Sequence, residues 1–300
     1  MEQQVPSPTD TDALANRINF HTRDLHNVID KTMSIKATFA LRHSFIYKDI
    51  LLSYYYVFRT LEDEIDFIIS NDRSHIGEIL RGFFNDKFRR KDQILKDLKF
   101  LNVIQDQSDD QWLSSRPELC KFLNFIKSNL HEHPVDVLAY CHVLYLALFA
   151  GGRIMRASMN KNLSFFFMPK FDKMSHTDVI MNATNFFKFD KDIVSENKLK
   201  SEYKRNYDIL TKAKLNEDEK LEIIDISREI FKFNFNLLQE IGTVNKDELM
   251  KNFNYKMVTY VVEEWKFRKP QIKKYVILFL IIFHLFVFIN LFKKFYLQAI

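Results

Sequence analysis

Helix-breaking and turn-forming residues are scarce in this sequence. Its 300 residues include only five glycines and six prolines, which is well below the usual share of either residue. Turn dipeptides are correspondingly few, and little of the chain alternates between polar and apolar residues. A β-sandwich or a β-barrel needs both features. The sequence therefore argues against these classes and predicts an all-α fold.

Cysteine is scarce too, and the excess of basic charge is small. Cys120 and Cys141 are too few to build a disulfide framework or a zinc site by themselves. Both lie in apolar surroundings, where a free cysteine behaves as a small hydrophobe, which indicates a reducing compartment. The net charge of +5 is spread along the chain without a block of basic and aromatic residues. We therefore expect no nucleic-acid partner.

One long hydrophobic run lies near the C-terminus. Residues 275–292, YVILFLIIFHLFVFINLF, carry no formal charge. As a helix this run would be about 27 Å long, close to the hydrocarbon thickness of the endoplasmic reticulum membrane. An interfacial helix needs a charged face, which this run does not have, and a buried core helix is the remaining alternative. We expect the run to be a transmembrane helix in contact with membrane lipid.

The charges beside this run predict its orientation. Four basic residues precede it and two follow it: Arg268, Lys269, Lys273 and Lys274, then Lys293 and Lys294. This asymmetry favours a cytosolic location for the large domain. Only eight residues follow the run, so it would enter the membrane after translation ends, as a tail anchor. We expect the endoplasmic reticulum membrane or the continuous nuclear envelope.

The rest of the chain divides into few segments. We predict a disordered N-terminus at 1–10, one compact multi-helix domain at 11–243, a basic linker or helix at 244–274, the anchor at 275–292 and a short tail at 293–300. Within the domain, helical spacing of apolar residues marks 11–30, 44–70, 76–101, 118–130, a stretch from about 134 through a glycine pair, 197–213 and 217–241. Asn216 and Glu219 can cap the last of these helices.

The helix that contains the glycine pair is the most informative. Residues 137–150, VLAYCHVLYLALFA, are apolar nearly all round, so this helix should lie inside the domain. It continues into Gly151 and Gly152, although a glycine inside a helix costs about 1 kcal/mol relative to alanine. Two interpretations remain open. The glycines mark a tight helix crossing or a helix end, or they let a flat ligand approach the backbone.

Five short motifs follow one another along this domain. They are HTRDLHNVID at 21–30, LEDEID at 61–66, AYCHVLYLALFAGG at 139–152, LKSEYKRNYDIL at 199–210 and IFKFNFNLLQEI at 230–241. In this order they resemble the heme oxygenase family over about residues 13–241. With the predicted anchor after them, the chain is most similar to the tail-anchored type of yeasts and other fungi. The resemblance implies a single helical domain that binds heme b.

The resemblance also implies which residues hold the heme. His26 corresponds to the axial ligand of the heme iron, and His21 is the alternative one turn away. Gly151 and Gly152 would give the porphyrin access to the distal helix, and with His26 and His142 they form the expected catalytic set. The expected heme contacts are Arg17, His142, Lys200, Lys204, Phe231 and Asn234, of which the basic residues would meet the propionates.

The sequence departs from the family on the distal side of the heme. Leu148 stands where the family has an aspartate, and Phe58 stands where it has a tyrosine. In the family these polar groups order the water that delivers protons, so their loss should weaken proton transfer. Either other groups, His142 first among them, take over this role, or the chain binds heme without degrading it.

These observations predict a heme oxygenase. It would use heme as cofactor and substrate, with O2 and with electrons from NADPH through NADPH–cytochrome P450 reductase. The products would be biliverdin, carbon monoxide and ferrous iron, and the purpose would be recovery of heme iron. The alternative is a non-catalytic, membrane-anchored heme-binding protein that acts as a sensor or buffer. A tethered coiled-coil interaction protein is disfavoured because no heptad pattern persists. We expect the soluble domain to be monomeric.

Overall fold

The structure is a computed structural model. It describes residues 10–27, 44–71, 75–103, 109–161 and 174–251, together with 253, 255–257, 259, 274–275 and 277–283. The regular secondary structure of these residues is entirely helical, which confirms the predicted all-α class. The chain forms two compact units, Met1–Glu248 and Leu249–Ile300.

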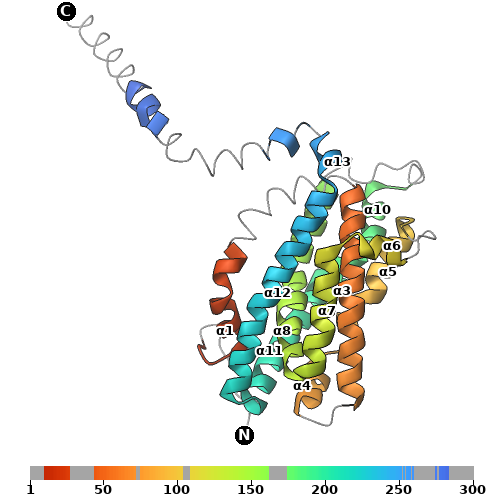
Figure 1. Ribbon diagram of the computed structural model, residues 1–300, viewed down its shortest axis with the longest axis vertical. Helices are drawn as coiled ribbons and strands as arrows, with labels where there is room; N and C mark the ends of the chain where they lie inside the picture. The colour runs from red at the N-terminus through yellow and green to blue at the C-terminus, as the bar shows by residue number, and fades with distance from the viewer. Residues whose placement is uncertain are drawn as a thin grey trace, which may run out of the picture. The chain divides into compact units, whose positions relative to one another are not determined.

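The first unit is a bundle of helices in which three long helices lie side by side (Figure 1). These are α3 (Ser44–Asn71), α7 (Pro117–Glu132) and α12 (Glu217–Val244). Other α-helices of this unit include α1 (Leu14–His21), α4 (His75–Phe83), α5 (Lys91–Phe100), α6 (Asp109–Ser114), α8 (Val137–Tyr140), α9 (Leu146–Lys161), α10 (His176–Ala183) and α11 (Ile193–Lys214). Its last residues begin α13 (Lys246–Met250). Short 3₁₀ turns occupy η1 (Asp86–Phe88), η2 (Pro134–Asp136) and η5 (Asn185–Phe187).

Local sequence signals explain where several helices begin and what they bury. Along α3, fully or nearly fully buried apolar residues recur every three to seven positions: Leu51, Phe58, Leu61, Ile65 and Ile68. This spacing places one stripe of α3 in the core. The start of α12 has the predicted capping box, in which Asn216 accepts from the Glu219 N–H and Glu219 accepts from the Asn216 N–H.

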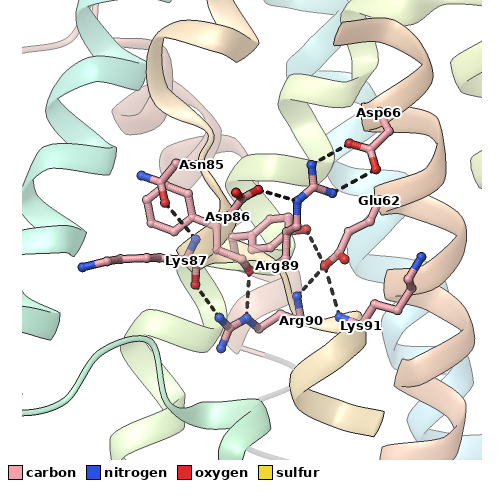
Figure 2. Close-up of polar contacts among 10 residues, drawn as sticks. Glu62, Asp66, Asn85, Asp86, Lys87, Arg89, Arg90 and Lys91 are labelled. Atoms are coloured by element: carbon pink, nitrogen blue, oxygen red, sulfur yellow. Dashed lines mark hydrogen bonds and ion pairs between the residues drawn. The ribbon is translucent and has the colours of Figure 1, made fainter. Parts of the chain in front are cut away.

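The helix predicted at 76–101 is divided in two, and the acidic motif explains the division (Figure 2). The chain turns between α4 and α5, where the Glu62 carboxylate of α3 accepts the N–H groups of Arg90 at 2.5 Å and Lys91 at 3.3 Å. The Arg90 guanidinium, 1% exposed, donates to the Lys87 and Phe88 carbonyls of the same turn. Burial raises the pKa of Glu62. These long-range bonds hold a turn that local periodicity does not reveal.

The predicted membrane anchor falls largely outside the described residues. Residues 274–275 and 277–283 are helical with exposed side chains. The remainder of 275–292 lies outside the described residues, and so does 1–9 of the predicted disordered N-terminus. Within the described part of the chain, one helical stretch is long and apolar enough to cross a membrane, Pro134–Ala157. Its most apolar window is 71% buried, as expected for a core helix. The tail anchor therefore stays a prediction.

Candidate functional site

A continuous helical rod carries the glycine pair, and its middle turn is a π-helix. α8 passes into the π-helix η3 (Cys141–Tyr145) and then into α9. A π-helix widens the turn and leaves carbonyl groups to be satisfied from outside. The Tyr203 hydroxyl of α11 donates to the Cys141 carbonyl of this turn at 2.9 Å, and the Tyr207 hydroxyl donates to the Leu138 carbonyl of α8 at 3.1 Å. We call α8, η3 and α9 together the distal helix.

The two glycines of the distal helix lie in different surroundings. A methyl group on Gly152 would lie 3.1 Å from the Phe187 carbonyl oxygen and 3.2 Å from the Phe187 Cβ. Within the described part of the chain, a methyl group on Gly151 would meet no atom within 4 Å outside its own helix. Ala147, one turn before Gly151, is exposed. The helix-crossing interpretation thus describes Gly152, and the ligand interpretation stays a prediction for Gly151. Gly152 allows a close crossing with η5, and Gly151 belongs to an open face of small residues.

His26 lies on a short helical continuation of α1, facing α12. Its side chain is exposed, and its ring packs edge-on against Phe231 with 6.2 Å between the centroids. Arg228 of α12 fixes this part of α1, because it pairs with Asp24 at 2.8 Å and also donates to the His21 carbonyl. The structure therefore brings the predicted iron ligand next to a predicted pocket residue.

The second predicted residue of α12 lies on the same helical face as Phe231. Asn234 follows Phe231 by three residues, and both side chains are half-buried. The Asn234 side-chain oxygen accepts a hydrogen bond of 2.9 Å from the Tyr54 hydroxyl of α3. α12 as a whole contacts both α1 and the distal helix, which precede and contain the residues that the sequence assigns to opposite sides of the heme.

His142 joins the distal helix to α1. Its Nε2 lies 3.1 Å from the Asn19 Oδ1 of α1, and its ring centroid is 5.7 Å from that of Tyr207. Its Nδ1 is buried and has no hydrogen-bond partner among the described residues. Burial, with a smaller contribution from the charge of Lys204, lowers the pKa of His142 to about 3. The imidazole is therefore neutral at physiological pH, and its role in proton transfer stays a prediction.

The three predicted propionate contacts differ in their present partners. Lys200 and Lys204 are half-buried one turn apart on α11, and neither forms an ion pair within the described parts of the chain. Lys200 lines a small pocket that Leu148, Phe149 and Arg153 also line. Arg17 is already paired with Glu217 of α12 at 2.5 Å. A propionate contact from Arg17 would require it to leave this carboxylate.

The positions that depart from the family are apolar in the structure as well. Phe58 is 1% exposed, and its ring packs edge-on against Tyr145 and Phe186 with centroids 5.3 and 5.7 Å apart. Leu148 is half-buried in the pocket beside Lys200. The side chains at these two positions therefore offer no proton.

Sequence reasoning missed three tyrosines. Tyr203 and Tyr207 stand four residues apart in one of the five motifs, so their common face was visible, but their carbonyl acceptors were not. Tyr54 stands in the run YYYVF, which gives no sign that its hydroxyl reaches α12. Each of these bonds joins residues that are far apart in the chain.

Comparison with known proteins identifies the family of the chain. Residues 12–240 match the sequence profile of the heme oxygenase family, and the chain belongs to that family. It is 45% identical over 276 residues to the heme-binding protein HMX1 of Saccharomyces cerevisiae, which covers 88% of this chain and 86% of the yeast protein.

Solved structures share the fold at low identity. Heme oxygenase-2 of Synechocystis, in complex with heme and NO, has a TM-score of 0.64 at 18% identity, covering 83% of this chain and 92% of that one. Heme oxygenase of Leptospira interrogans has a TM-score of 0.59 at 21% identity, covering 76% and 99%. These likenesses confirm the predicted heme oxygenase-like fold.

Proposed function

We propose that this protein is a heme oxygenase that cleaves heme b to biliverdin, carbon monoxide and ferrous iron. It would take electrons from NADPH through NADPH–cytochrome P450 reductase, use O2, and serve to recover heme iron. The observation that carries the proposal is the exposed His26 imidazole against Phe231, in a family member whose distal helix has an open face at Gly151.

Heme is both substrate and cofactor in this proposal, and the described residues fit it. An exposed imidazole suits an axial ligand, and the open space at Gly151 suits a flat macrocycle. Lys200 and Lys204 are half-buried cations without ion pairs in the described residues, as two propionates require. These parts belong to the short helical segment after α1, to α9 and to α11, and α12 contacts both α1 and η3.

Each of these residues has a separate task. Bound heme supplies the iron at which O2 is activated. His26 would hold the iron from the α1 side, and the Phe231 ring would restrict the rotation of the imidazole. Lys200 and Lys204 would orient the porphyrin through its propionates. Leu148 and Phe58 would keep bulk water from the distal side, which protects a reactive site from side reactions.

A specific observation favours a second function. The distal positions Leu148 and Phe58 are apolar, and the yeast relative at 45% identity is named a heme-binding protein. A non-catalytic sensor or buffer would bind heme through the same His26 and leave the ring intact. Hemin-loaded full chain with reductase and NADPH separates the two functions: release of biliverdin and carbon monoxide supports the oxygenase, and intact heme supports the sensor or buffer.

We also propose that residues 275–292 anchor the protein in the endoplasmic reticulum membrane with the helical domain in the cytosol. The uncharged run and the basic residues before it support this topology. A membrane-bound reductase could then meet the domain on the same surface. Protease treatment of sealed microsomes tests the proposal. Digestion of the domain in intact vesicles is expected, and protection of the domain would contradict it.

A further inference from the structure

A hydrogen bond between two side chains crosses the wall of the proposed heme pocket. The Tyr54 hydroxyl of α3 donates to the Asn234 Oδ1 of α12 at 2.9 Å. Both side chains are half-buried, and burial raises the pKa of the Tyr54 phenol, which keeps it a donor. Tyr54 precedes Phe58 by one helical turn, so the phenol lies on the same side of α3 as the apolar ring at Phe58.

The Tyr54–Asn234 pair connects the two sides of the site. On one side, Asn234 shares a face of α12 with Phe231, whose ring contacts His26. On the other side, the Tyr54 ring lies 6.4 Å from Phe58, and Phe58 packs against Tyr145 of the distal helix. Phe231 and Phe58 therefore link the pair to the proposed iron ligand and to the distal helix.

The direction of this bond determines which part of the amide remains for a ligand. Because the Asn234 oxygen accepts from Tyr54, its N–H2 group is left as the donor. Among the described residues, the bond to Tyr54 is the one hydrogen bond that the Asn234 side chain makes. A side-chain amide held at its oxygen cannot turn that oxygen toward a ligand without losing the bond.

Resting on the proposed function, we propose that Tyr54 is a positioning residue that holds Asn234 so that its N–H2 group donates a hydrogen bond to the diatomic ligand of the heme. The site would then distinguish O2 from carbon monoxide, because O2 bound to ferrous heme takes up negative charge and carbon monoxide takes up little. A donor fixed in advance stabilises such charge without reorganisation. The pair would supply the polar contact that Phe58 and Leu148 do not.

The test compares the dissociation rates of O2 and carbon monoxide from the full-length ferrous heme complex, without reductase. Tyr54→Phe keeps the ring and removes the hydroxyl. We expect O2 to dissociate about tenfold faster, the usual worth of one hydrogen bond, with carbon monoxide changed less than twofold. Asn234→Leu should have the same effect. Adding Tyr54→Phe to Asn234→Leu should change the O2 rate less than twofold, because Tyr54 acts through the amide.

Tyr47→Phe is the matched control. Tyr47 is a buried tyrosine of the same helix, and its hydroxyl donates to the Ala183 carbonyl at 2.8 Å. This variant loses a buried hydroxyl of α3 and should keep wild-type rates for both gases. Equal rates in Tyr54→Phe and wild type would overturn the proposal. If Asn234→Leu speeds O2 dissociation and Tyr54→Phe does not, the positioning role of Tyr54 is overturned.

Failure of the proposed function gives a different result. A protein that binds heme through His26, shows the O2 effect and yet makes no biliverdin would contradict the oxygenase and keep the positioning role. If the wild type makes biliverdin but Tyr54→Phe leaves both gas dissociation rates unchanged, the oxygenase is supported and the positioning role of Tyr54 is overturned. A full chain that binds no hemin would overturn both.

Discussion

Replacing Gly151 and, separately, Gly152 with alanine should change the stability of the protein in opposite directions. At Gly151 the added methyl group meets no atom within 4 Å outside its own helix, so helix propensity decides the outcome. Alanine is favoured over glycine inside a helix by about 1 kcal/mol. For a domain of this size, that gain should raise the midpoint of thermal unfolding by about 2–4 °C.

At Gly152 the same gain is opposed by a collision. The methyl group would lie 3.1 Å from the Phe187 carbonyl oxygen, and Phe187 cannot retreat easily. Its neighbour Phe186 is held at both ends, since its N–H donates to Asp97 at 2.8 Å and its carbonyl accepts from Arg90 at 3.2 Å. Overpacking of this kind costs about 1–3 kcal/mol. We therefore expect Gly152→Ala to lower the midpoint by a few degrees.

A larger side chain at Gly151 connects stability with heme binding. Gly151→Leu should keep the gain in helix propensity, because leucine is also a good helix former. It should weaken hemin binding at least about tenfold, which corresponds to 1.4 kcal/mol, since the branched chain occupies the space proposed for the porphyrin. Circular dichroism of the heme-free full chain in detergent and Soret titration with hemin measure the two effects. A Gly151→Leu protein that loses stability and keeps hemin affinity would refute this reasoning.

Four further predictions address separate parts of the site and the chain. His26→Ala should abolish the wild-type ferric heme spectrum, and added imidazole should partly restore it; an unchanged Soret band would shift attention to His21. His142→Phe should lower the free energy of unfolding by about 1 kcal/mol through the lost bond to Asn19 and slow biliverdin formation at least about tenfold; normal turnover would reject its proton role. Burial raises the pKa of Asp136 from 3.8 to about 6. Between about pH 4 and 6 the native state therefore binds a proton that the unfolded chain does not, so stability falls as pH rises through that range. Asp136→Asn should raise the free energy of unfolding at pH 7.5 by about 1–3 kcal/mol, and urea melts at several pH values should no longer show this dependence. A chain ending at Pro270 should stay soluble and bind hemin, whereas aggregation of this chain alone would identify 275–292 as a core helix.

Features set by neighbouring residues could be predicted from the sequence. The capping box of Asn216 and Glu219 marks the start of α12, as predicted. The distal helix was expected to lie inside the domain because 137–150 are apolar nearly all round. Residues 137–145 are buried, as expected, whereas Leu146 and Leu148 are half-buried and Ala147 is exposed. In each case the signal lies within a few turns of the feature that it specifies.

Features set by distant residues could not be predicted in this way. Glu62 binds the turn between α4 and α5, and the Tyr203 hydroxyl of α11 binds a carbonyl of the π-helix. The glycine pair shows the difference most directly. Both interpretations were open in the sequence because the residue that separates them, Phe187, comes from a later segment of the chain. The same holds for Tyr54, whose partner Asn234 lies on α12.

The central claim is that this protein opens the heme ring although the distal side chains at Leu148 and Phe58 are apolar. The most direct measurement follows the visible spectrum and the carbon monoxide released from the full chain, loaded with hemin, after addition of NADPH and reductase. A known heme oxygenase in the same mixture shows that the reductase is competent. We predict loss of the Soret band with equimolar biliverdin and carbon monoxide. Heme that stays intact while the control turns over would contradict the claim.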